Sequence, residues 1–297
     1  MNKTIVIAGV TGNLGGKIVN ALLALGANVK AIVRMETHKE KIAALESKGV
    51  IVAQINMADK NAVAAACQGA SCFVSAIAGL RDTIIDAQLV LLEGAVLAKV
   101  PRFIPSDFST DFTNLTPNKN RNLDARRDFH THLNKADIKA TSIFNGAFME
   151  LLTTDMPLIL FAKKRILCWG NPNIKMDFTN TLNIATFTAH AALDYTTPRY
   201  LHIAGDSKSA NDVKEMMSKI SNENYKLFKP GGIGLFNIII NIAKFFDRKK
   251  TELYPAWQGM QYMRDMMEGK AELSKHDNDR YKMSWINMEE YIVSQKK

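Results

Sequence analysis

The sequence contains few cysteines. Its 297 residues include only Cys67, Cys72 and Cys168, too few for the disulfide framework of a small secreted domain. Four residues separate Cys67 from Cys72, and this spacing matches no standard zinc motif. We therefore expect buried, reduced thiols, no metal site and a cytoplasmic location.

Long hydrophobic runs are also missing. The strongly apolar stretch 235–246 has twelve residues, whereas a membrane-spanning helix needs ~20, so we expect no membrane span. Its polar residues recur at spacings of 4, 3 and 4, which is one stripe of an otherwise apolar helix; they are Asn237, Asn241, Lys244 and Arg248. We predict a buried or lid helix, and the broad apolar arc leaves a membrane-surface helix as the alternative.

The charge lacks a concentrated tail. The chain has 38 basic and 29 acidic side chains, a net charge of +9. Residues 1–150 carry 17 basic and 13 acidic groups (+4), and residues 151–297 carry 21 and 16 (+5). An excess spread over both halves does not indicate nucleic acid, although an anionic small ligand fits it. The apolar fraction of 47% and charged fraction of 23% are ordinary for a globular protein.

Short apolar runs alternate with helical patterns in the first half of the chain. The predicted strands are 3–8, 29–33, 50–54, 71–78, 102–105 and 140–144, and the predicted helices are 17–25, 37–47, 60–67, 82–99 and 122–135. This alternation predicts an α/β fold, a doubly wound parallel sheet. We expect a nucleotide-binding domain at 1–150 and a smaller substrate-covering region at 151–297, of which about 177–220 packs back on the sheet.

A glycine motif follows the first predicted strand. Residues 3–8 read as a strand and not as a secretory signal, since they lead directly into G-x-x-G-x-x-G. Glycine permits a tight strand-to-helix turn and lets a pyrophosphate approach the backbone at the helix N-terminus. The expected cofactor-binding residues here are Gly9, Thr11, Gly12, Asn13, Leu14 and Gly15, and we add Ala78 at the end of the fourth predicted strand.

The end of the second strand distinguishes the two nicotinamide cofactors. An acidic residue there would bind the NAD ribose, whereas a basic residue suits a 2′-phosphate. The strand ends in Arg34, and Lys39 or Lys41 follows a few residues later. Glu36 could reach a ribose, or could face solvent before a helix that Thr37 caps. We predict that NADP(H) is preferred over NAD(H).

Several stretches together resemble the NmrA-like and isoflavone reductase-like atypical short-chain dehydrogenases. They are the glycine motif, the strand end at Val33 and Arg34, residues 102–108 (RFIPSDF), 145–150 (NGAFME) and 197–205 (TPRYLHIAG). The resemblance covers nearly the whole chain and weakens beyond about residue 225. It implies a Rossmann domain, a smaller C-terminal substrate region and usually NADPH, and it leaves the substrate open.

The chain departs from short-chain dehydrogenases at the proton-transfer residues. The only Tyr-x-x-x-Lys is Tyr225 to Lys229, far from the expected helix, and we interpret it as coincidental. Isoflavone reductase-like enzymes tend to have a lysine on the helix after the fifth strand. Counting back from residues 146–148 puts Arg126 at that position. Arginine stays protonated, so Arg126 could bind an anionic oxygen but is a poor proton donor or base.

Other candidates follow later strands. Ser106 and Asp107 come after the fifth strand, at the carboxyl edge where ligands bind, with a turn or cap role as the alternative. Asn145, Phe148 and Met149 end the sixth strand, where the resemblance implies contacts with nicotinamide and substrate. Core packing is the competing role for Phe148.

A run rich in methionine and aromatic residues occupies 257–267. Trp257 and Met263 could line an adaptable apolar substrate pocket, although plain core packing is the commoner role for such a run. His130 and His132 lie two apart on a predicted helix, so they do not share a face and predict no metal pair.

These observations favour an NADPH-dependent reductase that transfers a hydride to a small apolar, aromatic or quinone-like acceptor. The alternative is an NADP(H)-binding redox sensor with little or no turnover, which Arg126 and the missing Tyr-x-x-x-Lys favour. A dehydratase or epimerase that uses the cofactor catalytically is a third hypothesis. The expected partner is a small-molecule substrate, and the expected assembly is a monomer or homodimer.

Overall fold

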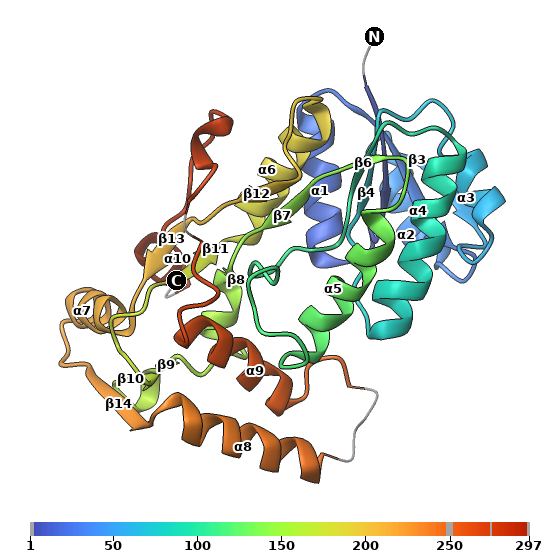
Figure 1. Cartoon of the computed structure of the whole chain (residues 1–297). Helices are drawn as coiled ribbons and strands as arrows, with labels where there is room; N and C mark the ends of the chain where they lie inside the picture. The colour runs from blue at the N-terminus through green and yellow to red at the C-terminus, as the bar shows by residue number, and fades with distance from the viewer. Residues whose placement is uncertain (1–2, 248–251, 274, 296–297) are drawn as a thin grey trace.

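The computed structural model describes residues 3–247, 252–273 and 275–295. Its centre is a six-stranded parallel sheet (Figure 1). The strands run in the order β3 (Ile51–Ile55), β2 (Asn28–Arg34), β1 (Thr4–Ala8), β4 (Cys72–Ser75), β5 (Arg102–Ile104) and β6 (Lys139–Ala140). The strand order reverses between β1 and β4. In open parallel sheets, ligands bind at the carboxyl edge beside such a reversal.

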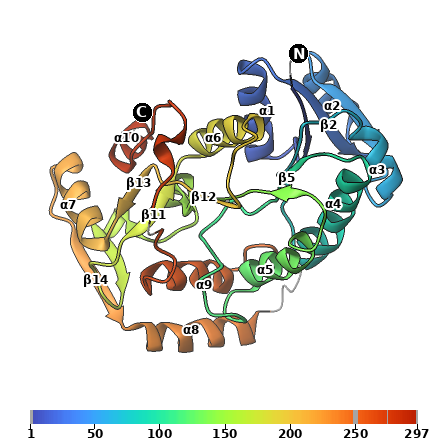
Figure 2. The ribbon, with the colours of Figure 1, turned by 45° about the horizontal axis from the view of Figure 1, so that its top comes forward.

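Helices cover both faces of this sheet (Figure 2). α1 (Asn13–Ala24), α2 (Lys39–Glu46) and α6 (Thr181–Leu193) share one core, and α3 (Lys60–Ala66), α4 (Gln88–Leu97) and α5 (Arg121–Leu133) share the other. In β1, Ile5 and Ile7 enter the first core, while Val6 and Ala8 enter the second, because strand side chains alternate between faces. The predicted doubly wound α/β fold is confirmed.

The sixth predicted strand, 140–144, is divided in the structure. β6 pairs with β5, and β7 (Ser142–Phe144) pairs with β12 (Tyr200–His202). The break occurs at Thr141, whose N–H still bonds to Phe103 O while its hydroxyl donates to Pro198 O. Residues 177–220, expected to pack back on the sheet, include β12 beside β7 and α6 against α1.

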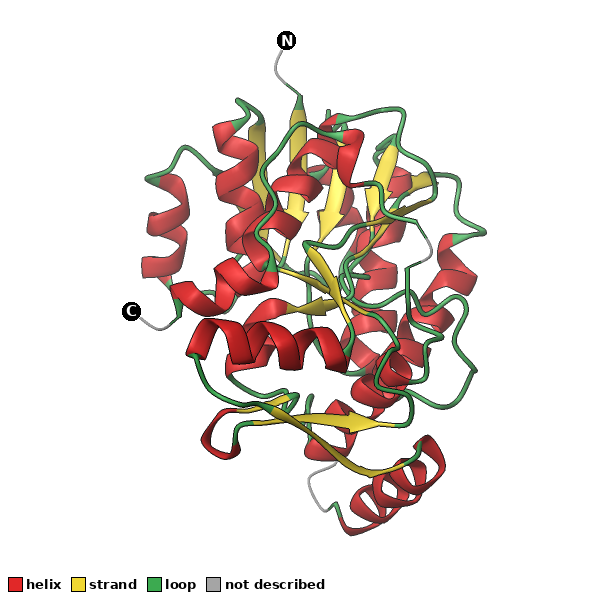
Figure 3. Cartoon of the chain, turned by 90° about the vertical axis from the view of Figure 1, so that its left-hand side faces the viewer, coloured by secondary structure: helices red, strands yellow, loops and turns green. Residues whose placement is uncertain are grey.

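Besides α6 and β12, which pack beside the central sheet, the described C-terminal residues form two small sheets and the helices α7 to α10 (Figure 3). One sheet is β14 (Lys226–Gly231), β10 (Arg165–Trp169) and β9 (Ile159–Leu160); the other is β13 (Asp206–Lys208), β11 (Met176–Thr179) and β8 (Ala147–Phe148). The helices are α7 (Ala210–Ser221), α8 (Ile233–Phe246), α9 (Ala256–Met267) and α10 (Met288–Ser294). Short 3-10 helices are η2 (Met149–Thr153), η3 (Phe161–Lys163) and η4 (Asn278–Arg280).

One apolar core joins these elements to the first half of the chain. It contains Phe178, Met217 and Met263, but also Phe144 and Met149. The region therefore shares side chains with the first half of the chain. The boundary near residue 150 stays a prediction. None of the described helices is both long and apolar enough to cross a membrane.

The predicted helix 82–99 is confirmed over 82–97, although its first part is a π-helix, η1 (Asp82–Ala87), that continues into α4. The predicted cap of the preceding helix was wrong. Thr37 caps no helix, because α2 begins one residue later than a Thr37 cap would allow and has His38 at its N-cap with no side-chain hydrogen bond. The capping-box spacing was present, but the chain turns there through a Thr37 N–H to Arg34 O bond.

Candidate functional site

The glycine turn after β1 is as tight as its sequence suggests. Gly9 has φ +88°, and a Cβ there would lie 2.3 Å from Ala76 O at the end of β4. A Cβ on Gly15 would lie 2.1 Å from Gly9 O. These two glycines are therefore required by the protein's own packing.

Gly12 differs from the other two. Its φ is −85°, and an added Cβ would meet only Gly9 O, at 3.3 Å. Packing alone therefore gives little reason for glycine at this position. The missing side chain leaves the outer side of the turn open, which is where a pyrophosphate would need to approach the backbone.

The N-terminus of α1 begins at this turn without a side-chain cap. Within the described residues, no backbone hydrogen bond uses the N–H groups of Asn13, Leu14 or Gly15. Uncapped N–H groups and the positive end of the helix dipole suit an anion. Thr11 is exposed at the same turn.

The side chains of two cationic residues at the end of β2 and on α2 make no contact with a polar partner among the described residues. Arg34 ends the strand with an exposed side chain, and Lys41 is exposed on α2. Neither side chain makes a hydrogen bond or ion pair to another described residue, and only their backbone groups are bonded, as in Thr37 N–H to Arg34 O. Glu36 is also exposed, and Ala78 is exposed after β4. The glycine turn, Arg34 and Ala78 all follow carboxyl ends of neighbouring strands.

Asp107, just beyond β5, is fully buried in a polar network. Its Oδ2 lies 2.6 Å from His130 Nε2 and accepts a 2.6 Å hydrogen bond from the Ser142 hydroxyl. Burial opposes its ionisation, but the charge and hydrogen bond of His130, helped by Ser142 and Arg126, hold the pKa of Asp107 below its usual range. Asp107 Oδ2 thus has internal partners, while Oδ1 has none.

Ser106 is the neighbour of Asp107 and is also buried. Its hydroxyl donates to Ile77 O at 2.6 Å, and its N–H donates to Gln88 Oε1 at 2.9 Å. These bonds tie the end of β5 to the segments after β4. Ser106 therefore holds the carboxyl end of β5 in place. Its carbonyl oxygen accepts a hydrogen bond from a third partner.

That partner is Arg126 on α5. Its Nε donates to Ser106 O at 3.0 Å, and its Nη1 donates to Asn122 O at 3.0 Å. The side chain is 8% exposed, yet it forms no ion pair with any described carboxylate. Tyr262 lies near enough to feel its charge: burial raises the pKa of Tyr262 to about 12, and Arg126 opposes that rise.

The segment after β7 holds the remaining candidates of the first half. Asn145 is fully buried; its N–H donates to Ser109 O and its carbonyl accepts from Thr179. Phe148 is half-buried against the α1 and α6 core, and Met149 lies inside the C-terminal core. Asn145 Oδ1 has no hydrogen-bond partner.

The model of the NmrA-like family matches residues 1–291. The chain belongs to the NmrA-like family. A probable pinoresinol-lariciresinol reductase 3 of Arabidopsis thaliana is 26% identical to it over 238 residues, covering 75% of this chain and 76% of that protein.

Solved structures show the same fold at lower identity. An isoflavone reductase superposes with a TM-score of 0.84 at 18% identity, covering 99% of this chain and all of that one (100%). AtPrR2 with NADP+ and (+)-pinoresinol gives a TM-score of 0.83 at 19% identity, covering 98% of each chain. The NmrA-like protein described here thus shares its architecture with these proteins over its whole length.

The two C-terminal candidates of this NmrA-like protein are buried on α9. Trp257 Nε1 donates to Asp247 Oδ2 at 2.6 Å, and the Arg121 guanidinium lies 4.7 Å from the Trp257 ring centroid. Met263 packs in the C-terminal core with Met266 and Met267. Their place in a substrate pocket stays a prediction, since these contacts are those of core residues.

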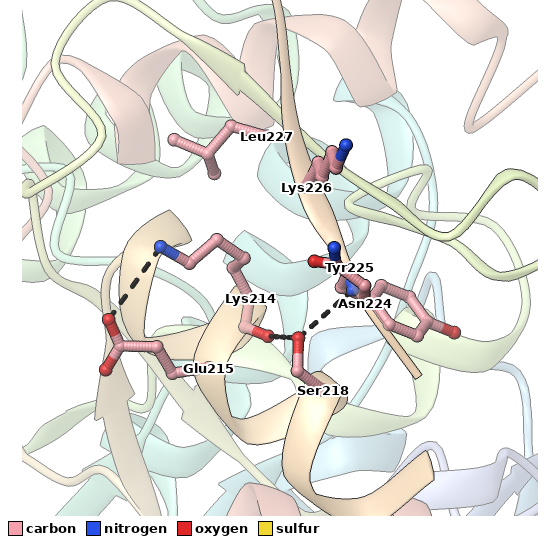
Figure 4. A pocket seen from close by; sticks show the side chains of 7 residues that line it. All are labelled: Lys214, Glu215, Ser218, Asn224, Tyr225, Lys226 and Leu227. Carbon is pink, nitrogen blue, oxygen red and sulfur yellow. Dashed lines mark hydrogen bonds and ion pairs between the residues drawn. The ribbon is translucent and has the colours of Figure 1, made fainter. Parts of the chain in front are cut away.

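The Tyr-x-x-x-Lys match lies far from the glycine turn, and His130 serves an internal hydrogen bond. Tyr225 and Lys229 lie on or beside β14, at the far side of the C-terminal region from the glycine turn (Figure 1). Tyr225 lines an open hollow of about 550 Å³ between α7 and β14, with its neighbours drawn in Figure 4. His130 is used by Asp107, and no group of three potential metal ligands occurs among the described residues.

Sequence reasoning missed Glu150 at the junction of the two regions. Its Oε1 accepts from Thr181 N at 3.0 Å and from Asn180 Nδ2 at 3.2 Å, at the N-terminus of α6. Lys17 of α1 lies 4.0 Å from the same oxygen. Glu150 ends the NGAFME stretch that carries the family resemblance, and this was a sequence signal for it. Its hydrogen-bond partner Asn180 lies thirty residues farther along the chain, so the contact itself could not be predicted.

Proposed function

We propose that this protein is an NADPH-dependent reductase of a small aromatic or quinone-like acceptor. The observation that carries the proposal is the open glycine turn: Gly12 lacks a side chain where packing does not require it, above an uncapped helix N-terminus. Its relatives' names support it, since a pinoresinol-lariciresinol reductase and an isoflavone reductase are among them.

The residues present fit a nicotinamide cofactor with a 2′-phosphate. Gly12 and the N–H groups of Asn13, Leu14 and Gly15 would hold the pyrophosphate. Arg34 would hold the 2′-phosphate through its planar fork, assisted by Lys41. Once bound, such a cofactor supplies a hydride. Ser106, Ala78 and Asn145 would then define the edge of the sheet along which the reacting ring is oriented.

Arg126 is the chain's own contribution to the chemistry. Adding a hydride to a quinone or a conjugated carbonyl leaves negative charge on the acceptor oxygen, which afterwards takes a proton from water. A buried guanidinium without a carboxylate partner can stabilise that oxygen as its charge develops. Asp107, with Oδ2 bonded to His130 and Ser142, needs no role in this step.

A sensor of the NADP(H) ratio is the second candidate. It is favoured by Arg126, which is a poor proton donor, and by the sequence of the helix after β5, which contains no Tyr-x-x-x-Lys. The cofactor-binding residues would be the same, and only turnover would differ.

Binding and turnover together test the proposal. We expect NADPH to bind more tightly than NADH, and Arg34→Ala to weaken NADPH by about tenfold while leaving NADH unchanged. Lys219→Ala is the control: it also removes one positive charge, but on α7, away from the glycine turn. Equal NADPH affinity of the wild type and Arg34→Ala would contradict the phosphate assignment.

The acceptor is identified by NADPH oxidation against quinones, enones and aromatic carbonyls. Arg126→Gln should raise the acceptor KM or lower kcat and leave NADPH affinity unchanged. No oxidation with any acceptor, together with unequal affinities for NADP+ and NADPH, would select the sensor.

We further propose a cytoplasmic monomer or homodimer. The three thiols are free and buried, and burial raises the pKa of Cys67 and of Cys72 to about 12. Inert thiols of this kind suit a reducing compartment.

A further inference from the structure

Helix α8 carries an apolar face that no described part of the chain covers. Only Phe236 and Ile240 of this helix are buried. The exposed fraction reaches 83% at Phe245 and 73% at Phe246. We call the exposed apolar set the α8 face; it consists of Leu235, Ile238, Ile242, Phe245 and Phe246.

The α8 face is continuous and points outward. The spacings of three, four and three from Leu235 to Phe245 place these side chains on one side of the helix. α8 contacts α9 with its other side and forms the lower edge of the molecule in Figures 1 and 2. A contiguous exposed apolar surface of this kind marks an interaction site.

The excess charge of the second half of the chain is concentrated in the stretch of sequence that contains α8. Residues 226–250 contain six basic and one acidic side chain (+5), while the rest of 151–297 contains 15 basic and 15 acidic. The whole excess of that half therefore lies in one stretch. Lys226, Lys229 and Lys244 are exposed; the other three cations, Arg248, Lys249 and Lys250, lie outside the described residues.

The single acid of the stretch is turned inward. Asp247 Oδ2 accepts the indole N–H of Trp257 at 2.6 Å, and Trp257 is 5% exposed. Its charge is therefore directed toward α9. The described cations of this stretch are Lys244 on α8 itself and Lys226 and Lys229 on β14, the strand that leads into the helix.

We propose that the α8 face binds the surface of an anionic lipid membrane. Phenylalanine and isoleucine side chains would enter the boundary between headgroups and acyl chains, and the lysines would meet lipid phosphates, as in interfacial amphipathic helices. A second copy of the chain fits less well, because two copies joined through α8 would bring two basic stretches together. Nucleic acid would leave the apolar side chains unpartnered.

This inference is independent of the proposed reductase. It concerns a surface built by α8 and β14, and its test needs neither cofactor nor substrate. Binding would hold the enzyme at the membrane without spanning it, since α8 has 14 residues against the ~20 that a span requires.

The test is co-sedimentation of the full chain with vesicles. We expect binding to vesicles of phosphatidylcholine and phosphatidylserine in equal parts, and weak binding to pure phosphatidylcholine. Phe245→Ser/Phe246→Ser should lower the affinity by about tenfold or more. Lys226→Gln/Lys229→Gln should lower it by about fivefold for each charge removed, and added salt should do the same.

Leu97→Ser is the matched control, since Leu97 is 52% exposed on α4, away from α8. It should leave vesicle binding unchanged, and all variants should keep the wild-type circular dichroism. Failure of the wild type to bind, or equal binding by Phe245→Ser/Phe246→Ser, would overturn the proposal. So would a lipid-free dimer in analytical ultracentrifugation that this double variant dissociates, because the face would then join two copies.

Discussion

The central sheet and the C-terminal region bury their apolar side chains in different ways. The sheet has helices on both faces. One of its two cores is built from consecutive strand–helix units, and the other adds α6 and β12 to such units. The C-terminal region builds its core from segments far apart in sequence, such as Ile166 and Met288, and leaves the outer face of α8 uncovered. Both faces of the sheet are covered by helices in the first case, whereas one apolar helix face is left exposed in the second.

The space around glycine residues also differs between these parts of the molecule. In the sheet region, Gly9 and Gly15 stand where the backbone of one segment touches that of another. In the C-terminal helices, a Cβ added to Gly234 or Gly259 would meet nothing within 4 Å. Close backbone packing also occurs where the two regions meet, since a Cβ on Gly146 would lie 2.1 Å from Asp177 O and one on Gly205 would lie 2.6 Å from Ile286 O. The contrast is therefore between the glycine turn and helices α8 and α9, and the following substitutions test it.

The largest effect is expected at Gly15. In Gly15→Ala the new methyl would lie 2.1 Å from Gly9 O, a backbone atom that cannot move without shifting β1. We expect a loss of about 3 kcal/mol or more in the free energy of unfolding. Urea denaturation measures it. A variant as stable as the wild type would show that the turn is looser than its geometry implies.

Asp107→Asn tests whether the polar network supports the sheet region. Asp107 is fully buried with His130 and Ser142, so removing its charge should cost about 3 kcal/mol of stability. Because the folded-state pKa of Asp107 is depressed, its contribution is complete above the unfolded value of about 3.9 and disappears as the pH falls through the folded value.

The measurement is urea unfolding of both proteins from neutral to acid pH. The gap between them should close in acid. Asp128→Asn is the control, since the Asp128 pair with Arg81 is exposed on both sides and should be worth less than about 0.5 kcal/mol. A gap that does not depend on pH would contradict the electrostatic role of Asp107.

These two residues also show what sequence could predict. Gly15 belongs to a local pattern, so its turn, helix and place at the sheet edge could be predicted from residues 3–15 alone. Asp107 could be placed after β5, but its partners His130 and Ser142 come from two other elements. Phe178 is a similar case, since it pairs with Ala147 and Asp206 on two other strands. These strands are too short to show a periodic pattern in the sequence, and their partners lie far away along the chain.

Gly12→Ala separates ligand approach from packing. Its methyl would meet only Gly9 O at 3.3 Å, so stability should change by less than about 1 kcal/mol. If the turn holds a pyrophosphate, NADPH affinity should fall by about tenfold. Gly16→Ala is the matched control, because its methyl meets one backbone oxygen, Val10 O, at the same 3.3 Å. Equal affinities of the two variants would argue against a ligand at Gly12.

The smallest effect, and the only gain, is expected in the C-terminal region. Gly259 lies inside α9, is exposed, and has open space where a Cβ would be. Alanine restricts the unfolded chain and favours the helix, so Gly259→Ala should stabilise the protein by about 0.5–1 kcal/mol. Thermal unfolding measures the shift. A loss of stability would mean that α9 packs as tightly as the glycine turn, and the contrast between the two regions would then be confined to the surface of α8.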